Sequence, residues 1–161
     1  MTVTLAEFNT APPGEARDLL TACLAVPRWV DAVLQGRPYP DQAALTGAAR
    51  LSLTEDETRR AIESHPRIGD KPSGSGTSAQ WSRSEQSGVD DDMAVRFRAA
   101  NAEYEERFGH VFLVRASGRS GAELLANLRE RLRNDPSTEL AVAGRELVEI
   151  AMLRLGKAVT A

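Results

Sequence analysis

Apolar residues recur every three or four positions through most of the chain, which is the spacing of one face of an α-helix. Alternation of apolar and polar positions, the pattern of a half-buried strand, is nearly absent. The pattern therefore predicts a mainly α-helical protein. The only strand-like stretch is Val111–Val114, and one short run does not make a sheet.

Turn and cap residues divide the first half of the chain into several expected helices. Proline suits the first position of a helix, which fits a helix that begins at Pro27. Thr54 and Glu57 have the spacing of a capping box, in which each side chain accepts a hydrogen bond from the other residue's main chain. Pro66 disfavours helical geometry in the residue before it, so we expect the helix that begins at Thr54 to end at His65. The expected helices cover 19–24, 27–35, 40–48 and 54–65.

Three further helices are predicted after a loop rich in Gly and Ser at 72–78, which is either a lid over a site or a plain connection. The first is long and runs from the acidic triplet Asp90–Asp92, whose charges suit a helix N-terminus, to Phe108. The second opens at Ser120, where Glu123 repeats the capping-box spacing. The third is the C-terminal helix.

The C-terminal helix carries a charged residue on its apolar side. Arg154 lies on or near a stripe made of Leu140, Ala143, Leu147, Ile150 and Ala151. A buried guanidinium needs an anionic or strongly accepting partner, because an unpaired interior charge is severely penalised. Pattern alone favours an ordinary internal ion pair, or a side chain whose charged end reaches solvent, over a bound ligand.

Composition narrows the protein class and its partners. A chain of 161 residues with 42% hydrophobic and 27% charged residues is expected to form one domain over 1–161. A net charge of -3 and the absence of a Lys/Arg run argue against nucleic acid and membrane partners. The start of the chain lacks the features of a signal peptide, so we expect a cytoplasmic protein. One cysteine, which looks structural, and two histidines are too few for a typical zinc site.

His65 is the best candidate for chemistry, because an imidazole can act as an acid or a base near neutral pH. The residues alone leave open a histidine that caps a helix or packs in the core.

Two central motifs carry a resemblance to a known family. His65-Pro66-Arg67-Ile68-Gly69 is followed by Ser82-Arg83-Ser84-Glu85-Gln86 and then Gly88. Weaker landmarks lie on both sides, namely Phe8-Asn9, Cys23, Arg28-Trp29, Arg37-Pro38, Asn101, Tyr104, Arg107-Phe108-Gly109, Phe112, Leu132, Asn134, Glu149-Ile150 and Leu153-Arg154-Leu155. With these residues the chain resembles, almost end to end, the decarboxylases of 2-oxo-4-hydroxy-4-carboxy-5-ureidoimidazoline (OHCU) in the ureide branch of purine breakdown. His110 departs from the apolar or aromatic residue common after this Phe-Gly.

The resemblance implies a compact all-α helical bundle, usually a homodimer, that converts OHCU to (S)-allantoin and carbon dioxide without cofactor or metal. It implies that His65 is the catalytic acid/base and that Glu85 is the catalytic carboxylate that orients the reacting groups. Arg154 would contact a carboxylate or polarised oxygen of OHCU, with Arg119 as the reserve candidate. Some relatives are fused to a transthyretin-like domain, for which this chain has no room.

The family pattern also implies further substrate contacts, whose alternative is local capping and packing. These are Pro66, Ser82, Gln86 and the main chain of Phe112, Leu113, Val114, Arg115 and Ala116. Two other functions stay open. One is a helical interaction module that kept the fold and lost catalysis, and the other is decarboxylation of a related ureido or imidazoline acid.

Overall fold

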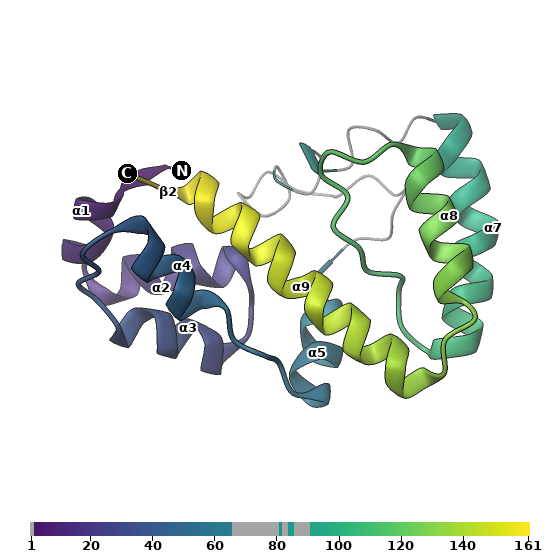
Figure 1. Cartoon of the computed structure of the whole chain (residues 1–161), viewed down its shortest axis with the longest axis horizontal. Coiled ribbons are helices and arrows are strands. Elements are labelled where there is room, and N and C mark those ends of the chain that lie inside the picture. The colour runs from purple at the N-terminus through teal and green to yellow at the C-terminus, as the bar shows by residue number, and fades with distance from the viewer. Residues whose placement is uncertain (1, 66–80, 82–83, 86–90) are drawn as a thin grey trace.

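The structure is a computed structural model of the 161-residue chain, and it describes residues 2–65, 81, 84–85 and 91–161. Helices dominate these residues, which confirms the all-α prediction. In chain order they are α1 (Leu5–Thr10), α2 (Pro13–Cys23), α3 (Pro27–Gln35), α4 (Gln42–Ala49), α5 (Glu55–Ile62), α7 (Asp91–Phe108), α8 (Gly121–Arg131) and α9 (Pro136–Ala158). Two short strands, β1 (Val3–Thr4) and β2 (Val159–Thr160), pair in parallel and hold the two ends of the chain together (Figure 1).

Both predicted capping boxes are present. The Thr54 hydroxyl accepts the N–H of Glu57 at the start of α5, and the Glu57 carboxylate accepts the N–H of Thr54 in return. Ser120 and Glu123 make the same reciprocal pair at the start of α8. These bonds satisfy main-chain donors that a helix leaves unpaired at its first turn, which explains why the helices begin there.

Several sequence predictions are wrong in detail. Helix α5 ends at Ile62 rather than at His65, and a turn follows in which the N–H groups of Ser64 and His65 bond to the carbonyls of Ala61 and Ile62. Val111–Val114 forms no strand, and the strands among the described residues are β1 and β2, which were not predicted. Helix α1 was not predicted either. The loop at 72–78 lies outside the described residues.

Two hydrophobic clusters flank helix α9, which crosses the molecule diagonally (Figure 1). Helices α1 to α5 pack with α9 in the first cluster, and α7 and α8 lie side by side as a parallel pair in the second cluster on the other side. The segment that joins α7 to α8 runs between α9 and this pair (Figure 1). Along that segment, Leu113 packs in the first cluster, whereas Phe112 and Val114 pack in the second. The segment therefore binds the two halves together.

Candidate active site

Helix α9 carries Arg154 on its buried side, as its apolar stripe predicts, and only 2% of the residue is exposed. Its Nε and NH2 donate hydrogen bonds of 2.9 and 3.1 Å to the two carboxylate oxygens of Glu85, which is also buried. NH1 donates to the carbonyl oxygen of Ala22 on α2 at 3.4 Å. The predicted ion pair therefore exists, and its forked geometry is the strongest form of an arginine–carboxylate contact.

His65 lies just past the end of α5 and is partly buried. Its main-chain N–H donates a 3.0 Å hydrogen bond to the carbonyl of Ile62, which ties the residue to the last turn of that helix. Burial, together with the smaller effect of the positive charge of Arg154, lowers the pKa of His65 to about 4. The imidazole is therefore uncharged at neutral pH, and it is close enough to Arg154 to respond to that charge.

Two other side chains surround Arg154. Its guanidinium carbon lies 5.8 Å from the centroid of the Trp81 ring, within the range of a cation–π contact. Cys23, at the end of α2, is 1% exposed, and burial raises the pKa of its thiol to about 12 although Arg154 opposes the rise. A thiol with that pKa stays protonated and is a poor nucleophile, so Cys23 is a packing residue. Sequence reasoning did not identify Trp81 as a site residue.

The predicted substrate-contact segment buries most of its side chains, so the main chain is what it can offer to a ligand. Phe112, Leu113, Val114 and Ala116 are all 5% exposed or less, whereas Arg115 is only partly buried. The other three predicted contacts, Pro66, Ser82 and Gln86, lie outside the described residues.

Arg119, the reserve candidate for the substrate arginine, lies at the end of this segment. It faces Glu146 of α9 with 3.7 Å between NH1 and Oε1. Among the described residues, Glu85 pairs with Arg154, whereas Arg119 pairs with Glu146.

A second buried ionic cluster, which sequence reasoning missed, joins α8 to α9. Arg131 is 4% exposed and donates through Nε to Oε1 of Glu139 at 2.7 Å. The hydroxyl of Tyr104 donates to the same carboxylate oxygen at 2.5 Å, and the Asn134 amide donates to the other oxygen at 3.0 Å. Arg131 also donates through NH1 to the carbonyl of Leu113 at 2.6 Å. The cluster therefore reaches the main chain of the predicted substrate segment.

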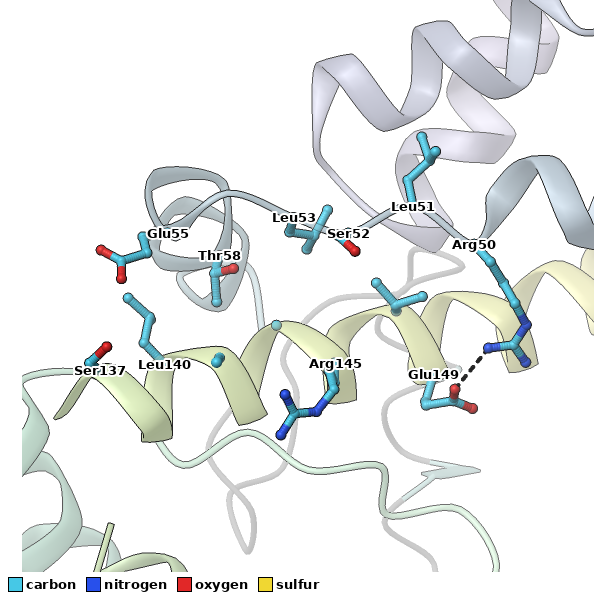
Figure 2. Close-up of a pocket in the computed structure, with 13 residues that line it drawn as sticks. Arg50, Leu51, Ser52, Leu53, Glu55, Thr58, Ser137, Leu140, Arg145 and Glu149 are labelled. Carbon is cyan, nitrogen blue, oxygen red and sulfur yellow. Dashed lines mark hydrogen bonds and ion pairs between the residues drawn. The ribbon is translucent and has the colours of Figure 1, made fainter. Parts of the chain in front are cut away.

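A cavity of about 560 Å³ lies between α5, α9 and the connection from α4 to α5 (Figure 2). Leu51, Leu53 and Leu140 form part of its wall, and an exposed ion pair of 3.0 Å between Arg50 and Glu149 lies at one end. The described residues that line it do not include His65, Glu85 or Arg154. This cavity is therefore separate from the cluster of predicted catalytic residues.

The described residues form neither a membrane-spanning helix nor a metal-binding cluster. None of the described helices is long and apolar enough to cross a membrane. No group of three or more His, Cys, Asp or Glu side chains within 2–65, 81, 84–85 and 91–161 gathers in a way that could hold a metal ion.

Comparisons with a family model and with known proteins point to the same family. A family model described as OHCU decarboxylase matches residues 9–156. The uric acid degradation bifunctional protein TTL of Arabidopsis thaliana is 41% identical over 103 residues, covering 60% of this chain and 32% of the plant protein. The chain thus spans about a third of that relative. A 2-oxo-4-hydroxy-4-carboxy-5-ureidoimidazoline decarboxylase of Amia calva is 33% identical over 132 residues, covering 77% of this chain and 75% of the relative.

Solved structures agree with this family. A crystal structure of OHCU decarboxylase in the presence of (S)-allantoin has a TM-score of 0.72 and 27% identity, covering 87% of this chain and 96% of that chain. A crystal structure of (S)-allantoin synthase has a TM-score of 0.69 and 19% identity, covering 97% of this chain and 54% of that chain. The second match, at its low identity, supports the fold alone.

Proposed function

The chain belongs to the OHCU decarboxylase family, and from this membership we propose that it decarboxylates OHCU to (S)-allantoin and carbon dioxide in urate degradation. The observation that carries the proposal is the meeting of three distant residues at one buried place. Glu85 binds Arg154 through two hydrogen bonds, and the charge of Arg154 reaches His65. An uncharged imidazole beside a fixed guanidinium suits a reaction that moves protons while negative charge develops on oxygen.

The substrate supplies its own electron acceptor. The departing carboxylate of OHCU is bonded to a ring carbon that also carries a hydroxyl, next to a ring carbon doubly bonded to nitrogen. When carbon dioxide leaves, the electron pair of the broken bond forms a carbon–carbon double bond, and the imine nitrogen takes the displaced pair and a proton. The hydroxyl of the resulting enol then loses a proton, and the carbon that bears the ureido group gains one. The net change consumes one proton for each carboxylate lost.

His65 is proposed to move these protons. With a pKa of about 4 its imidazole is uncharged at neutral pH and can accept the proton of the substrate hydroxyl. The imidazolium formed in this way is a strong acid, because burial and Arg154 both disfavour its charge. It can then return the proton to the carbon that bears the ureido group. Delivery from one fixed side gives a single enantiomer of allantoin.

Arg154 and Glu85 are proposed to act as a unit. Glu85 fixes the plane of the guanidinium by binding Nε and NH2. Arg154 then stabilises the oxygen on which negative charge develops as carbon dioxide departs. Strong binding of the departing carboxylate would stabilise the bound substrate more than the transition state. Contact with the developing oxyanion is therefore the productive arrangement.

The test follows the handedness of the product, since OHCU decays spontaneously to racemic allantoin. OHCU is generated in situ, and allantoin is followed by circular dichroism with wild-type protein, His65→Asn and no protein. We expect rapid dichroic product with wild type and a loss of roughly 100-fold or more in kcat/KM for His65→Asn, the usual contribution of a general acid/base. Optically silent decay at the same rate in all three samples would overturn the assignment and favour a binding module.

Three expectations from the sequence belong to this proposal. They are that residues 1–161 form one OHCU decarboxylase domain, that the protein works as a homodimer, and that it resides in the cytoplasm. The family match over residues 9–156 supports the first. Light scattering of the purified protein at micromolar concentration tests the dimer, because a mass near that of the 17.4 kDa monomer would contradict it.

A further inference from the structure

The main chain that the family pattern assigns to the substrate is held by a charged side chain. Arg131 reaches from the last turn of α8 to the carbonyl of Leu113, at 2.6 Å from NH1. Its guanidinium carbon also lies 4.6 Å from the centroid of the Phe112 ring. Arg131 therefore contacts two consecutive residues of the segment, one through the main chain and one through the side chain.

Arg131 is itself held by Glu139 of α9. The two side chains are joined by the 2.7 Å bond from Nε, and NH2 lies 2.5 Å from the same carboxylate oxygen. Tyr104 and Asn134 donate to that carboxylate as well. A guanidinium fixed on one edge by a buried carboxylate has little freedom, so its other edge sets the position of the Leu113 carbonyl.

The segment needs such an anchor because it belongs to no helix or strand. Its other main-chain hydrogen bond within the described residues closes a turn, in which the N–H of Arg119 donates to the carbonyl of Ala116 at 3.1 Å. Between these two anchored carbonyls lie the N–H groups of Val114, Arg115 and Ala116, for which the described residues provide no acceptor. Main-chain donors in a buried segment need acceptors, and a bound ureido or ring oxygen would supply them.

We propose that Arg131, held by Glu139, is a positioning residue for the decarboxylation: it fixes the main chain of Phe112–Ala116 at the place where this segment receives OHCU. The inference rests on the proposed function, because the segment is a substrate contact only if the protein binds OHCU or its product. Arg131 acts through the segment and has no contact with the reacting atoms in this scheme. In reactions that depend on precise orientation, a displacement of even 1 Å in such groups lowers the reaction rate substantially.

The experiment compares two variants that weaken the same cluster. Arg131→Lys keeps the positive charge, but one ammonium group cannot replace both edges of the guanidinium. Tyr104→Phe removes a hydrogen bond to the same Glu139 oxygen and keeps the aromatic ring, without touching the Leu113 carbonyl. Both are assayed with OHCU by circular dichroism, at a temperature where each is folded.

We expect Arg131→Lys to raise KM about ten-fold and to lower the enantiomeric excess of allantoin. Tyr104→Phe should lower the melting temperature and keep KM within about two-fold of wild type. Amide hydrogen exchange at 112–116 should accelerate in Arg131→Lys relative to Tyr104→Phe, a result that does not depend on turnover. Equal KM, enantiomeric excess and exchange in the two variants would overturn the positioning role.

Failure of the proposed function gives a different result, since wild type itself would then yield no dichroic allantoin. If Arg131→Lys does not fold, Arg131→Met/Glu139→Gln takes its place, because it removes both charges and leaves neither one buried alone. The same rise in KM and loss of enantiomeric excess are expected for that double variant. Wild-type values would overturn the proposal.

Discussion

Arg131 and Arg154 are both buried against a glutamate, with 4% and 2% of their surfaces exposed, but their neighbours differ. The carboxylate that binds Arg131 also accepts hydrogen bonds from Tyr104 and Asn134, and the free edge of Arg131 binds a main-chain carbonyl. Arg154 also donates to a main-chain carbonyl, that of Ala22, but it lies near His65, whose pKa it lowers. The same pair of residue types thus fixes a segment in one place and tunes an imidazole in the other.

The difference shows how a buried ion pair can be assigned a role. A pair that holds a main-chain segment in place acts on structure, and it contributes to catalysis only through what it positions. A pair that changes the protonation of a nearby histidine acts on chemistry directly. The two arginines are therefore expected to differ in their effects on stability and on the titration of His65.

The largest effect on stability is expected from Arg131→Met. This change leaves the Glu139 carboxylate buried with only neutral donors, Tyr104 and Asn134. Breaking a buried pair on one side costs about 3–5 kcal/mol of unfolding free energy, which urea denaturation would measure. Arg131→Met/Glu139→Gln should recover much of this loss, because no uncompensated charge remains.

The matched control is the exposed pair between Arg50 and Glu149, which also involves a glutamate of α9. Arg50→Met should cost about 0.5 kcal/mol or less, since solvent screens an exposed pair. If the double variant at Arg131 and Glu139 were as unstable as Arg131→Met, lost packing over Phe112 and the lost bond to Leu113 would explain the cost instead of charge.

The rule that identified Arg154 from the sequence applies equally to Arg131, although the sequence prediction did not use it there. Arg154 was identified because it falls on the apolar stripe of its helix. Arg131 obeys the same rule, because it follows Leu124 and Leu128 on one face of α8, and both leucines are buried. Application of this rule to every charged residue would have identified Arg131 as a second buried cation.

Other features could not be predicted from the sequence, for physical reasons. Glu85 and Arg154 are 69 positions apart, and no local pattern indicates that these two side chains meet. Helix α1 has six residues and each strand has two, so none is long enough to show a period. The end of α5 was misplaced because Pro66 limits how far a helix can extend, but does not require it to extend that far.

A smaller effect is expected in the pH dependence of stability at His65. The pKa is about 4 in the folded protein and near 6.5 in an unfolded chain, so the unfolded chain binds a proton first as pH falls. The stability that this difference provides is full above about pH 6.5 and is lost between there and about pH 4. Relative to His65→Asn, wild type should lose on the order of 3 kcal/mol over that range in urea denaturation. A constant difference between the two proteins would contradict an imidazole that is held uncharged by burial.

The smallest effect separates the two arginines through the titration of His65. Because the charge of Arg154 contributes to the low pKa, Arg154→Met should raise the pKa of His65, while burial, the larger cause, holds it below its ordinary value. Arg154→Lys keeps the charge and should leave the pKa close to that of wild type. Arg131 is not among the groups that shift His65, so Arg131→Met should leave its titration unchanged. NMR titration of the imidazole measures all three, with His110→Asn used to assign the two histidine signals. An equal rise in Arg131→Met and Arg154→Met would mean that the two ion pairs act on His65 through a shared change in the fold rather than through the nearby charge.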